Sequence, residues 1–329
     1  MSRRKNGVQI VQRLIDRMPT WLFLTVAALV MVFFTLMTMS EMGWLPFDMP
    51  GWSDLLGMEG PYRPAIQLDG EQIAAVHMID VGQGDGILIQ TREKTVLIDA
   101  GERDQGQTIY DYLRSAGIKR LDLVIATHPH ADHIGGLAQV LEQVPAGEIL
   151  MPQLADSMVP TTAVFRRLLE TAEKQNIPVT AAGPGLSYDL GEGVLLTVLS
   201  PAGDYQDLND YSVVCRLDSG ETSFLFTGDA EKEVEEDLID LGADLRADVL
   251  KAGHHGSSTS SSEAFLNAVS PKIAAISCGA DNDYGHPHQE VLASFSQRDI
   301  SVYRTDLAGS VVFATDGKEI TVQTEREAG

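Results

Sequence analysis

Cysteine is scarce in this chain of 329 residues, which contains only Cys215 and Cys278. Two thiols cannot build the disulfide framework that holds small secreted domains together. Both lie in apolar runs of the kind that forms strands, so we expect buried small residues, neither bridged nor bound to metal. A hydrophobic core must therefore stabilise the fold, and a hydrophobic content of 44% is normal for a chain with a sizeable core.

Basic residues are also scarce, because 24 Lys+Arg stand against 47 Asp+Glu and give a formal net charge of -23. The first 20 residues hold five of the basic groups and one acid, so the remainder carries 19 Lys+Arg against 46 Asp+Glu. Solubility outside the cell is the simplest interpretation of this charge. An acidic surface also repels nucleic acid and anionic lipid, which argues against tight non-specific DNA binding.

Long apolar runs are absent with one exception, Trp21 to Met39, which contains no charged residue. Its length is close to the roughly 20 residues that span a bilayer. The basic residues before it predict a cytosolic N-terminus and an extracellular C-terminal part. We therefore expect an uncleaved single-pass anchor in the cell membrane over residues 21–39. A cleaved signal peptide is the alternative, but its apolar core would be shorter and residues 39–42 make a poor cleavage site.

The domain organisation follows from these features. Residues 1–20 are expected to form a cytosolic basic segment, 21–39 the transmembrane anchor, 40–71 a linker, and 72–329 one folded domain. A hairpin opens each half of this domain, and helices then alternate with strands. This order predicts an α/β fold of two sheets with helices outside them. Helices are expected at residues 108–117, 134–144, 161–175, 230–240, 262–269 and 287–298.

The eight histidines are strongly clustered. Seven of them fall at positions 128–133, 254–255 and 286–288, and only His77 stands alone. Because His77 lies in an expected strand, we interpret it as an ordinary core or surface histidine. The clustering of the other seven is not typical of histidines scattered over a surface, and it predicts a metal site.

The densest cluster, THPHADH at residues 127–133, directly follows an expected buried strand. A loop there places His128 and His130 on one side and directs Asp132 and His133 toward a second position. Imidazole and carboxylate groups suit Zn(II), Mn(II) or Fe(II) better than Ca(II). Four ligands are too many for one catalytic metal, which keeps an open position. The motif therefore predicts two neighbouring divalent metals that share a bridging water or hydroxide.

These motifs resemble those of the metallo-β-lactamase superfamily, in which HxHxDH follows a buried strand, with Asp99 upstream in LIDAG and Asp229 downstream in FTGDA. The segments DVGQGD, LKAGHHGSSTS and DNDYGHPH narrow the resemblance to the extracellular hydrolase domain of ComEC-type competence proteins. The similarity covers about residues 73 to 314. It implies a four-layer αββα sandwich, which agrees with the order of elements above.

The resemblance also implies a set of metal ligands. His128 and His130 would bind the first metal, Asp132 and His133 the second, and Asp229 would bridge the two. One histidine of the next pair would complete the second metal, and we favour His255 as this ligand and His254 as the group that faces a substrate oxygen. Zn(II) and Mn(II) are equally credible cofactors. The catalytic candidates are Asp132, His254 and His286.

Three further residues would orient a metal-bound histidine or complete the coordination of the first metal. Asp99 is expected to orient a metal-bound histidine, and Asp80 is a second candidate for the same task. Most members of the superfamily place a third histidine for the first metal shortly before the Gly-Asp strand, but here Asn209 or Asp210 stands nearest to that place. The first metal is therefore expected to be held more weakly, or partly by solvent.

Other residues in these motifs have open alternatives. His286 either lies in a turn before a helix whose first turn contains Pro287, or it approaches a phosphate and protonates a leaving oxygen. The hydroxyls of residues 257–262 either cap a helix or, through Ser257, contact substrate. Lys251 either offers its charge to an anionic substrate or is solvated.

The sequence predicts a membrane-anchored, outward-facing metal-dependent hydrolase, a phosphodiesterase or nuclease that acts through a metal-bridging hydroxide. The resemblance implies DNA as substrate, but the acidic surface fits a long polyanion poorly. A small phosphodiester, or one in a cell-surface polymer such as a teichoic-acid substituent, is therefore the alternative. With one expected span, the chain is not expected to conduct DNA by itself. A non-catalytic surface binding module of the same fold is a second alternative, and no protein partner is indicated.

Overall fold

The computed structural model describes residues 19–41, 68 and 70–326. The chain divides into two compact units, Met1–Arg63 and Pro64–Gly329. The expected basic segment up to residue 18 and nearly all of the expected linker lie outside the described residues. The limits predicted for the four segments therefore stay predictions.

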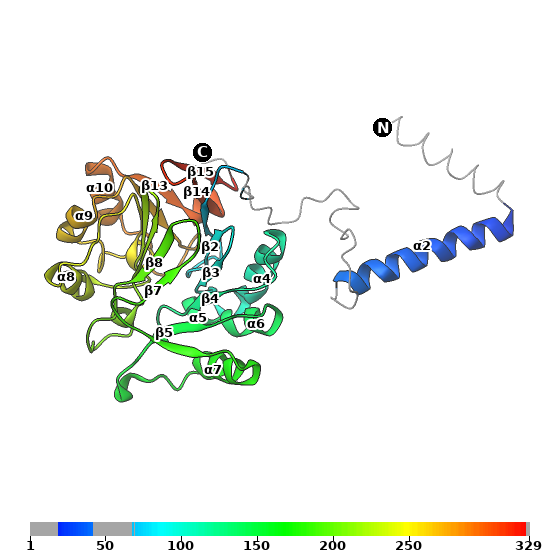
Figure 1. Cartoon of the computed structure of the whole chain (residues 1–329), viewed down its shortest axis with the longest axis horizontal. Coiled ribbons are helices and arrows are strands. Elements are labelled where there is room, and N and C mark those ends of the chain that lie inside the picture. The colour runs from blue at the N-terminus through cyan, green and yellow to red at the C-terminus, as the bar shows by residue number, and fades with distance from the viewer. Residues whose placement is uncertain (1–18, 42–67, 69, 327–329) are drawn as a thin grey trace. The chain divides into compact units, whose positions relative to one another are not determined.

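The first unit contains one described helix, α2 (Thr20–Glu41), which covers the apolar run expected to be an anchor (Figure 1). Several of its large apolar side chains are exposed, with Leu29 at 64% and Met31 at 68%. Within the described residues, no helix combines the length and the apolar character needed to cross a membrane.

The second unit is built on two mixed β-sheets. The first has eight strands in the order β15 (Ile320–Thr324), β14 (Val311–Thr315), β1 (Ala74–Met78), β2 (Ile87–Thr91), β3 (Thr95–Ile98), β4 (Leu123–Ile125), β5 (Ile149–Pro152) and β6 (Val179–Ala182). The second has seven strands in the order β13 (Ser301–Arg304), β12 (Ile273–Ile276), β11 (Val249–Lys251), β10 (Thr222–Phe226), β9 (Cys215–Ser219), β8 (Val194–Val198) and β7 (Ser187–Asp189). In each sheet hairpins supply the antiparallel part, and helical crossovers supply the parallel part.

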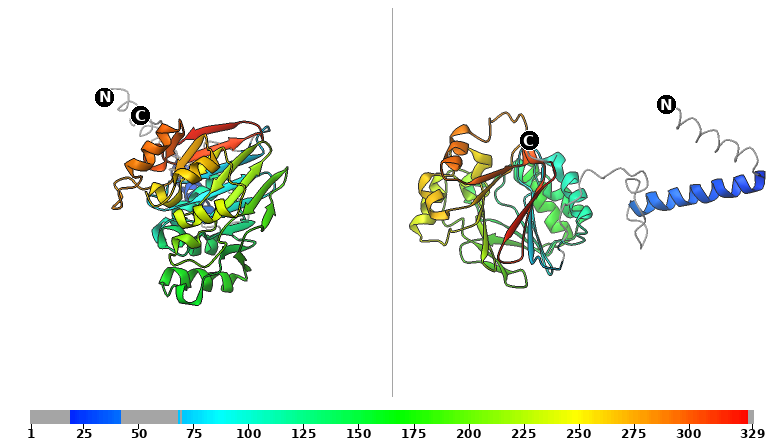
Figure 2. Two further views of the ribbon diagram at one scale, coloured as in Figure 1. Left: turned by 90° about the vertical axis from the view of Figure 1, so that its left-hand side faces the viewer. Right: turned by 90° about the horizontal axis from the view of Figure 1, so that it is seen from above.

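Helices cover the outer faces of the sheets, as Figures 1 and 2 show. On one side are α4 (Gly106–Ser115), α5 (Ala131–Ile134), α6 (Leu137–Gln143) and α7 (Ala163–Gln175). On the other are α8 (Lys232–Asp240), α9 (Glu263–Val269) and α10 (Gln289–Gln297), and the short α11 (Thr305–Ala308) follows β13. Short 3-10 turns lie at η1 (Arg103–Gln105), η2 (Asp156–Met158), η3 (Asn209–Tyr211) and η4 (Gly253–Gly256). Two mixed sheets flanked by helices agree with the predicted αββα sandwich.

The largest core cluster lies between the sheets, because strands of both contribute to it. Val76 and Ile89 come from the first sheet, and Leu196 and Phe224 from the second. Alternation along β8 shows how the sequence selects this face, since Leu196 is buried and Leu195 is 40% exposed. A second cluster joins the outer face of the second sheet to α8, α9 and α10. Both sheets are thus fixed rigidly enough to position the loops at their ends.

The structure corrects two details of the predicted elements and adds one strand pairing that was not predicted. The helix expected at 134–144 is interrupted, since α5 ends at Ile134 and α6 begins at Leu137. Gly136 between them packs so closely that a Cβ atom on it would lie 2.3 Å from the backbone oxygen of Ala100. Pro287 does not lie in the first turn of α10, which begins at Gln289 after the N-cap residue His288. The C-terminal hairpin pairs β14 with β1, so strands from the two ends of the domain are neighbours.

The prediction for the cysteines is confirmed, since Cys215 and Cys278 are both buried and unbridged. His77 is also a core residue, which agrees with one of the two interpretations given above. Its ring is fully buried in β1, and its Nδ1 atom lies 2.9 Å from the hydroxyl of Tyr112. Burial lowers the pKa of His77 to about 3, so the ring is neutral at pH 7.

Candidate metal centre

The predicted ligands gather where the loops after β4, β10 and β11 meet, which is at the carboxyl ends of these strands. A cavity of about 370 Å³ opens there. Its lining residues are Gln83, Glu102, His130, Ala131, Asp132, Asn209, Asp229, His254, His255, Tyr284 and His286. Carboxyl ends of parallel strands are a common position for ligand sites in α/β folds.

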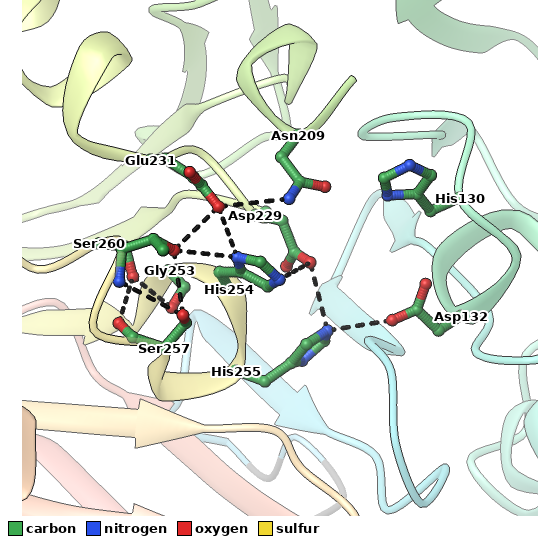
Figure 3. A network of polar contacts seen from close by, with 12 residues as sticks. His130, Asp132, Asn209, Asp229, Glu231, Gly253, His254, His255, Ser257 and Ser260 are labelled. Carbon is green, nitrogen blue, oxygen red and sulfur yellow. Dashed lines mark hydrogen bonds and ion pairs between the residues drawn. The ribbon is translucent and has the colours of Figure 1, made fainter. Parts of the chain in front are cut away.

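Four of the predicted ligands form one compact group, which we call the four-ligand group: Asp132, His133, Asp229 and His255. One ligand atom from each lies within 4.8 Å of the other three. The Nε2 atoms of His133 and His255 lie 3.2 and 3.3 Å from Oδ2 of Asp229. Nε2 of His255 is also 3.3 Å from Oδ2 of Asp132, and Figure 3 shows His255 between the two carboxylates.

The protein fixes both imidazoles of the four-ligand group from behind. Nδ1 of His133 donates to Oδ2 of Asp99 at 2.8 Å, and Nδ1 of His255 donates to the backbone oxygen of Ser277 at 2.9 Å. Each contact places the proton on Nδ1 and turns Nε2 toward the cavity, as in many metal sites. Asp99 therefore lies where its predicted role requires.

Charge is unevenly shared within the four-ligand group when no metal is bound. Burial lowers the pKa of His133, but the carboxylates of Asp229 and Asp99 outweigh it and raise this pKa well above its usual value. The same balance, dominated by Asp229, raises the pKa of His255 to about 9. Burial opposes ionisation of Asp229, but His133 and His255 hold the pKa of this carboxyl well below its usual range. Protons thus occupy positions that a cation would favour.

The four-ligand group fits a divalent metal. Three of its buried atoms make no hydrogen bond, namely Nε2 of His133, Nε2 of His255 and Oδ1 of Asp229. Buried polar atoms usually have a partner, so three convergent exceptions call for a ligand. Two imidazoles and two carboxylates suit Zn(II) or Mn(II).

The other two predicted ligands, His128 and His130, form a pair beside this group, and the ring centroid of His128 lies 4.2 Å from that of His133. Nε2 of His128 lies 3.1 Å from Nδ1 of His130. His128 is buried, and Ser212 and Thr127 lie near its other nitrogen at 3.4 and 3.1 Å. Burial and the charge of His133 lower the pKa of His128 well below its usual value. The pair can offer neutral nitrogen ligands, but it includes no carboxylate.

Asn209 lines the same cavity, as expected for the residue nearest the missing histidine. It lies in η3 and is 8% exposed, and its Oδ1 atom makes no hydrogen bond. Its Nδ2 atom donates to Oε1 of Glu231 at 3.4 Å. Figure 3 shows Asn209 and His130 on the same side of the cavity.

The two adjacent histidines of η4 have different surroundings. His255 is buried, whereas His254 faces the cavity with its Nδ1 atom 2.9 Å from Oε1 of Glu231. Both have positive φ angles, 46° for His254 and 54° for His255. Such angles are uncommon outside glycine and strain the backbone. The strained turn is what allows consecutive side chains to reach the same cavity.

Sequence reasoning missed Glu231. Oε1 of Glu231 accepts from His254, Thr259 and Asn209, so one carboxylate fixes three residues around the cavity. A signal was present, because Glu231 directly follows the FTGDA segment, two residues after Asp229.

Sequence reasoning also missed the buried carboxylate of Asp85, and both interpretations of Lys251 were wrong. Lys251 is 1% exposed, so it is neither solvated nor available to substrate. Its Nζ atom lies 2.6 Å from Oδ2 of Asp85, 2.8 Å from the backbone oxygen of Gly228 and 3.7 Å from Oδ1 of Asp229. Burial lowers the pKa of Lys251, but these two carboxylates outweigh it and raise the pKa. Lys251 balances charge beneath the four-ligand group.

The DVGQGD segment acts through its backbone. A Cβ atom on Gly84 would lie 2.1 Å from the backbone oxygen of Asp132, so only glycine lets the two loops approach. Asp80, in contrast, pairs with Arg326 at 3.1 Å, and its described contacts include no histidine. Asp85, and not Asp80, is the acid of this segment that reaches the centre.

The remaining candidates differ in their position. His286 lines the cavity, and its ring centroid lies 5.4 Å from that of His254. Burial and the neighbouring histidines lower the pKa of His286 to about 4. Ser257 is 4% exposed, does not line the cavity and bonds to the hydroxyl of Thr259 at 3.0 Å. Ser262 caps α9, so the capping interpretation of the 257–262 run is confirmed for this residue.

Comparison with known proteins agrees with this geometry. Residues 79–280 match the family model of the metallo-beta-lactamase superfamily. The chain is 32% identical over 269 residues to ComE operon protein 3 of Bacillus subtilis (strain 168), which covers 76% of this chain and 34% of that protein. It is 34% identical over 263 residues to Competence protein ComA of Neisseria gonorrhoeae, which covers 77% of this chain and 33% of that protein. The chain thus spans about a third of the length of these relatives.

Among solved structures, a mutant of CmlA beta-hydroxylase has a TM-score of 0.50 and 14% identity, over 74% of this chain and 54% of that one. At this identity the likeness concerns the fold alone. The sequence matches go further, since they include most of the chain and the whole ligand cluster. The chain belongs to the metallo-beta-lactamase superfamily, and its homologues are ComEC-type competence proteins.

Proposed function

We propose that this protein is a metal-dependent hydrolase that cleaves phosphodiesters. The observation that carries the proposal is the convergence of two buried imidazole nitrogens, from His133 and His255, on the buried carboxylate of Asp229, with three ligand atoms that make no hydrogen bond. A group that only stabilised the fold would be expected to give these atoms hydrogen bonds. The superfamily consists mostly of hydrolases, and the homologues are competence proteins, which supports a phosphodiester as the substrate.

The proposed ligands divide into two sets. Asp132, His133, Asp229 and His255 would hold one divalent metal, and His128 with His130 a second, with Asp229 between the two. Zn(II) and Mn(II) both suit these donors. Such metals act as Lewis acids on a phosphoryl oxygen and lower the pKa of bound water to about 7.

His254 is the proposed residue that serves the substrate directly. Its Nδ1–H donates to Glu231, which leaves Nε2 free to accept a proton or a hydrogen bond. Nε2 is 3.9 Å from Oδ2 of Asp229, so it lies at the edge of the metal ligands. His286 has a lowered pKa and is neutral at pH 7, so it is suited to donate one hydrogen bond to a leaving oxygen.

The cavity favours a substrate with few charges. The described lining residues include no lysine or arginine, and three of them are acids, namely Glu102, Asp132 and Asp229. Long polyanions are normally bound through several lysines and arginines. A small phosphodiester, a phosphodiester of a cell-surface polymer or a short stretch of DNA therefore fits this cavity better than a long duplex.

We also propose, from the sequence, that the apolar run of residues 21–39 anchors the chain in the membrane, with its N-terminus in the cytosol and the hydrolase domain outside. The absence of charge in this run and the basic residues before it support this placement. Alkaline carbonate extraction and protease protection of sealed cells test it. Release of the chain by carbonate would contradict the anchor.

The function is tested on the full chain purified without chelator. Bound metal is counted by mass spectrometry, and the same sample is assayed on bis-p-nitrophenyl phosphate and labelled DNA with added Zn(II) or Mn(II). We expect bound metal and phosphodiester turnover, both lost in Asp132→Ala. Asp283→Ala, which removes a carboxylate outside the cavity lining, is the matched control. No metal and no turnover would contradict the enzyme and leave a binding module of the same fold.

A further inference from the structure

One exposed aromatic ring stands at the rim of the cavity. Tyr284 lines the cavity, yet its side chain is 66% exposed. Its ring stacks on that of His286, with centroids 5.6 Å apart and planes at 18°. One face of the tyrosine is therefore occupied, and much of the remaining surface is open to solvent.

The ring lies close to the metal ligands. From Tyr284 the next ring is His286, and the centroid of His286 lies 6.2 Å from that of His255, a proposed ligand. Two ring contacts thus connect the exposed tyrosine with the metal centre. A substrate whose phosphodiester reached the metals would carry its neighbouring group past this tyrosine.

The loop that carries Tyr284 is held in one conformation. Oδ1 of Asn282 accepts from the backbone N–H groups of Tyr284 and His286 at 3.2 and 3.0 Å. Nδ2 of Asn282 donates to the backbone oxygens of Gly279 and His286 at 2.9 and 2.7 Å. A single amide side chain thus closes the turn of the DNDYGHPH segment. An aromatic ring on such a fixed turn needs little ordering when it binds a planar group.

The charge of the cavity decides what the ring can recognise. Because no lysine or arginine is among the described lining residues, the phosphates next to the cleaved one meet no basic side chain there. Affinity of the protein's side chains for the rest of the substrate is then expected from uncharged contacts. Stacking on an aromatic ring is such a contact, and proteins that hold single strands use it because every base has a flat face.

We propose that Tyr284, stacked on His286, forms a binding subsite for a nucleobase next to the cleaved phosphodiester. The substrate class is then a nucleotide ester or a short single strand, because the bases of a duplex are stacked on each other and unavailable. This inference rests on the proposed function and deepens it. It also separates nucleic acid from the surface-polymer alternative, whose repeating units carry no base.

The test measures binding and cleavage separately, on the full, metal-loaded chain. The probes are a fluorescent thymidine tetranucleotide and an abasic tetramer with the same backbone and charge. Fluorescence anisotropy gives the two Kd values, and their ratio isolates the contribution of the base. We expect the base to improve Kd by about tenfold or more, as stacking does elsewhere. Tyr284→Ala should bring the ratio close to one, and Tyr284→Phe should restore it, since the ring is kept.

Leu241→Ala is the matched control, because Leu241 is 65% exposed and does not line the cavity. Its Kd ratio should equal that of the unchanged chain. A ratio near one in the unchanged chain, or an unaltered ratio in Tyr284→Ala, would overturn the subsite. A base-dependent Kd without cleavage of either tetramer would support the subsite and contradict the proposed hydrolase. Cleavage of both tetramers with equal Kd would support the hydrolase and overturn the subsite.

Discussion

The two sets of proposed ligands share one cavity but are assembled in different ways. The four-ligand group collects side chains from the loops after β4, β10 and β11, mixes carboxylates with imidazoles and leaves three buried atoms without a hydrogen bond. The pair of His128 and His130 comes from one loop, and neither ring makes an ion pair with a carboxylate in the described part of the chain.

We expect the two sets to differ in metal affinity. Carboxylates attract a cation through their negative charge, and ligands held by separate rigid strands lose little conformational freedom when a metal binds. The four-ligand group is therefore expected to bind metal more tightly than the histidine pair. Four changes to the chain or its conditions test this expected difference in affinity.

The largest effect is expected from Asp229→Asn, which removes the carboxylate that faces His133 and His255. Metal content should fall, and phosphodiester hydrolysis should drop by more than about 100-fold, the upper end of what losing a supporting contact costs. Mass spectrometry and turnover of bis-p-nitrophenyl phosphate measure both. Asp244→Asn, at a side chain 73% exposed, is the control and should change neither. If Asp229→Asn kept its full metal content, the expected difference in metal affinity between the two sets would be contradicted.

The next effect concerns the charge beneath the four-ligand group. Lys251→Met removes the cation nearest to the buried carboxylate of Asp85 and leaves only His133 and His255, at 3.9 and 3.6 Å, so the free energy of unfolding of the metal-free chain should fall by about 3 kcal/mol, the lower end for a broken buried pair. Lys272 pairs with Asp248 at 2.8 Å but is 81% exposed, so Lys272→Met should cost at most about 1 kcal/mol. Denaturant unfolding measures both variants. Equal losses would show that burial does not set the strength of the Lys251 pair.

The third comparison uses pH. In the metal-free protein the carboxylate of Asp229 outweighs burial and raises the pKa of His255 to about 9, so metal must displace a proton at pH 7. Affinity of the four-ligand group should therefore rise by about tenfold per pH unit for each displaced proton, and the contribution of the His255 proton should level off near pH 9. Burial lowers the pKa of His128, so uptake by the pair should depend less on pH. Competition with a chromophoric chelator from pH 6 to 9 measures both slopes, and equal slopes would contradict the assignment.

The smallest effect is expected from Asn209→His, which offers the histidine pair a third imidazole. At a fixed free metal concentration that does not saturate the unchanged chain, metal content should rise toward two ions per chain, while turnover changes by less than about tenfold. Asn267→His, in α9 and outside the cavity lining, is the control. Unchanged occupancy in Asn209→His would show that the pair is already filled or that Asn209 cannot reach it.

Much of the fold could be predicted from local sequence patterns. Alternating apolar residues and turn residues located the strands, and the cap and periodicity signals located α7 to within two residues of its observed start. The C-terminal strand β15 and the edge strand β7 were missed, because both are short of buried residues. The pairing of β14 with β1 could not be predicted either, since it joins strands more than 200 residues apart.

The candidate site shows the same division. THPHADH, the Gly-Asp turn and the paired histidines could be identified as ligand candidates because residue type and spacing within one loop carry that information. Glu231, Asp85 and Lys251 could not be assigned a role, because each acts through a partner on another loop. Lys251 is the clearest example, since a lysine is expected at the surface unless a buried carboxylate such as Asp85 compensates it.

Residue types and their spacing already indicate the chemistry that this protein can offer: imidazole and carboxylate ligands on turns after strands, in an acidic chain with one apolar run. The packing of the domain was needed to show which ligands converge, which nitrogen of each histidine faces the cavity, and where a lysine balances the buried charge. Spacing along the chain fixes neighbours within a loop. Contacts between loops depend on how two sheets pack against each other, and this packing is a property of the whole core.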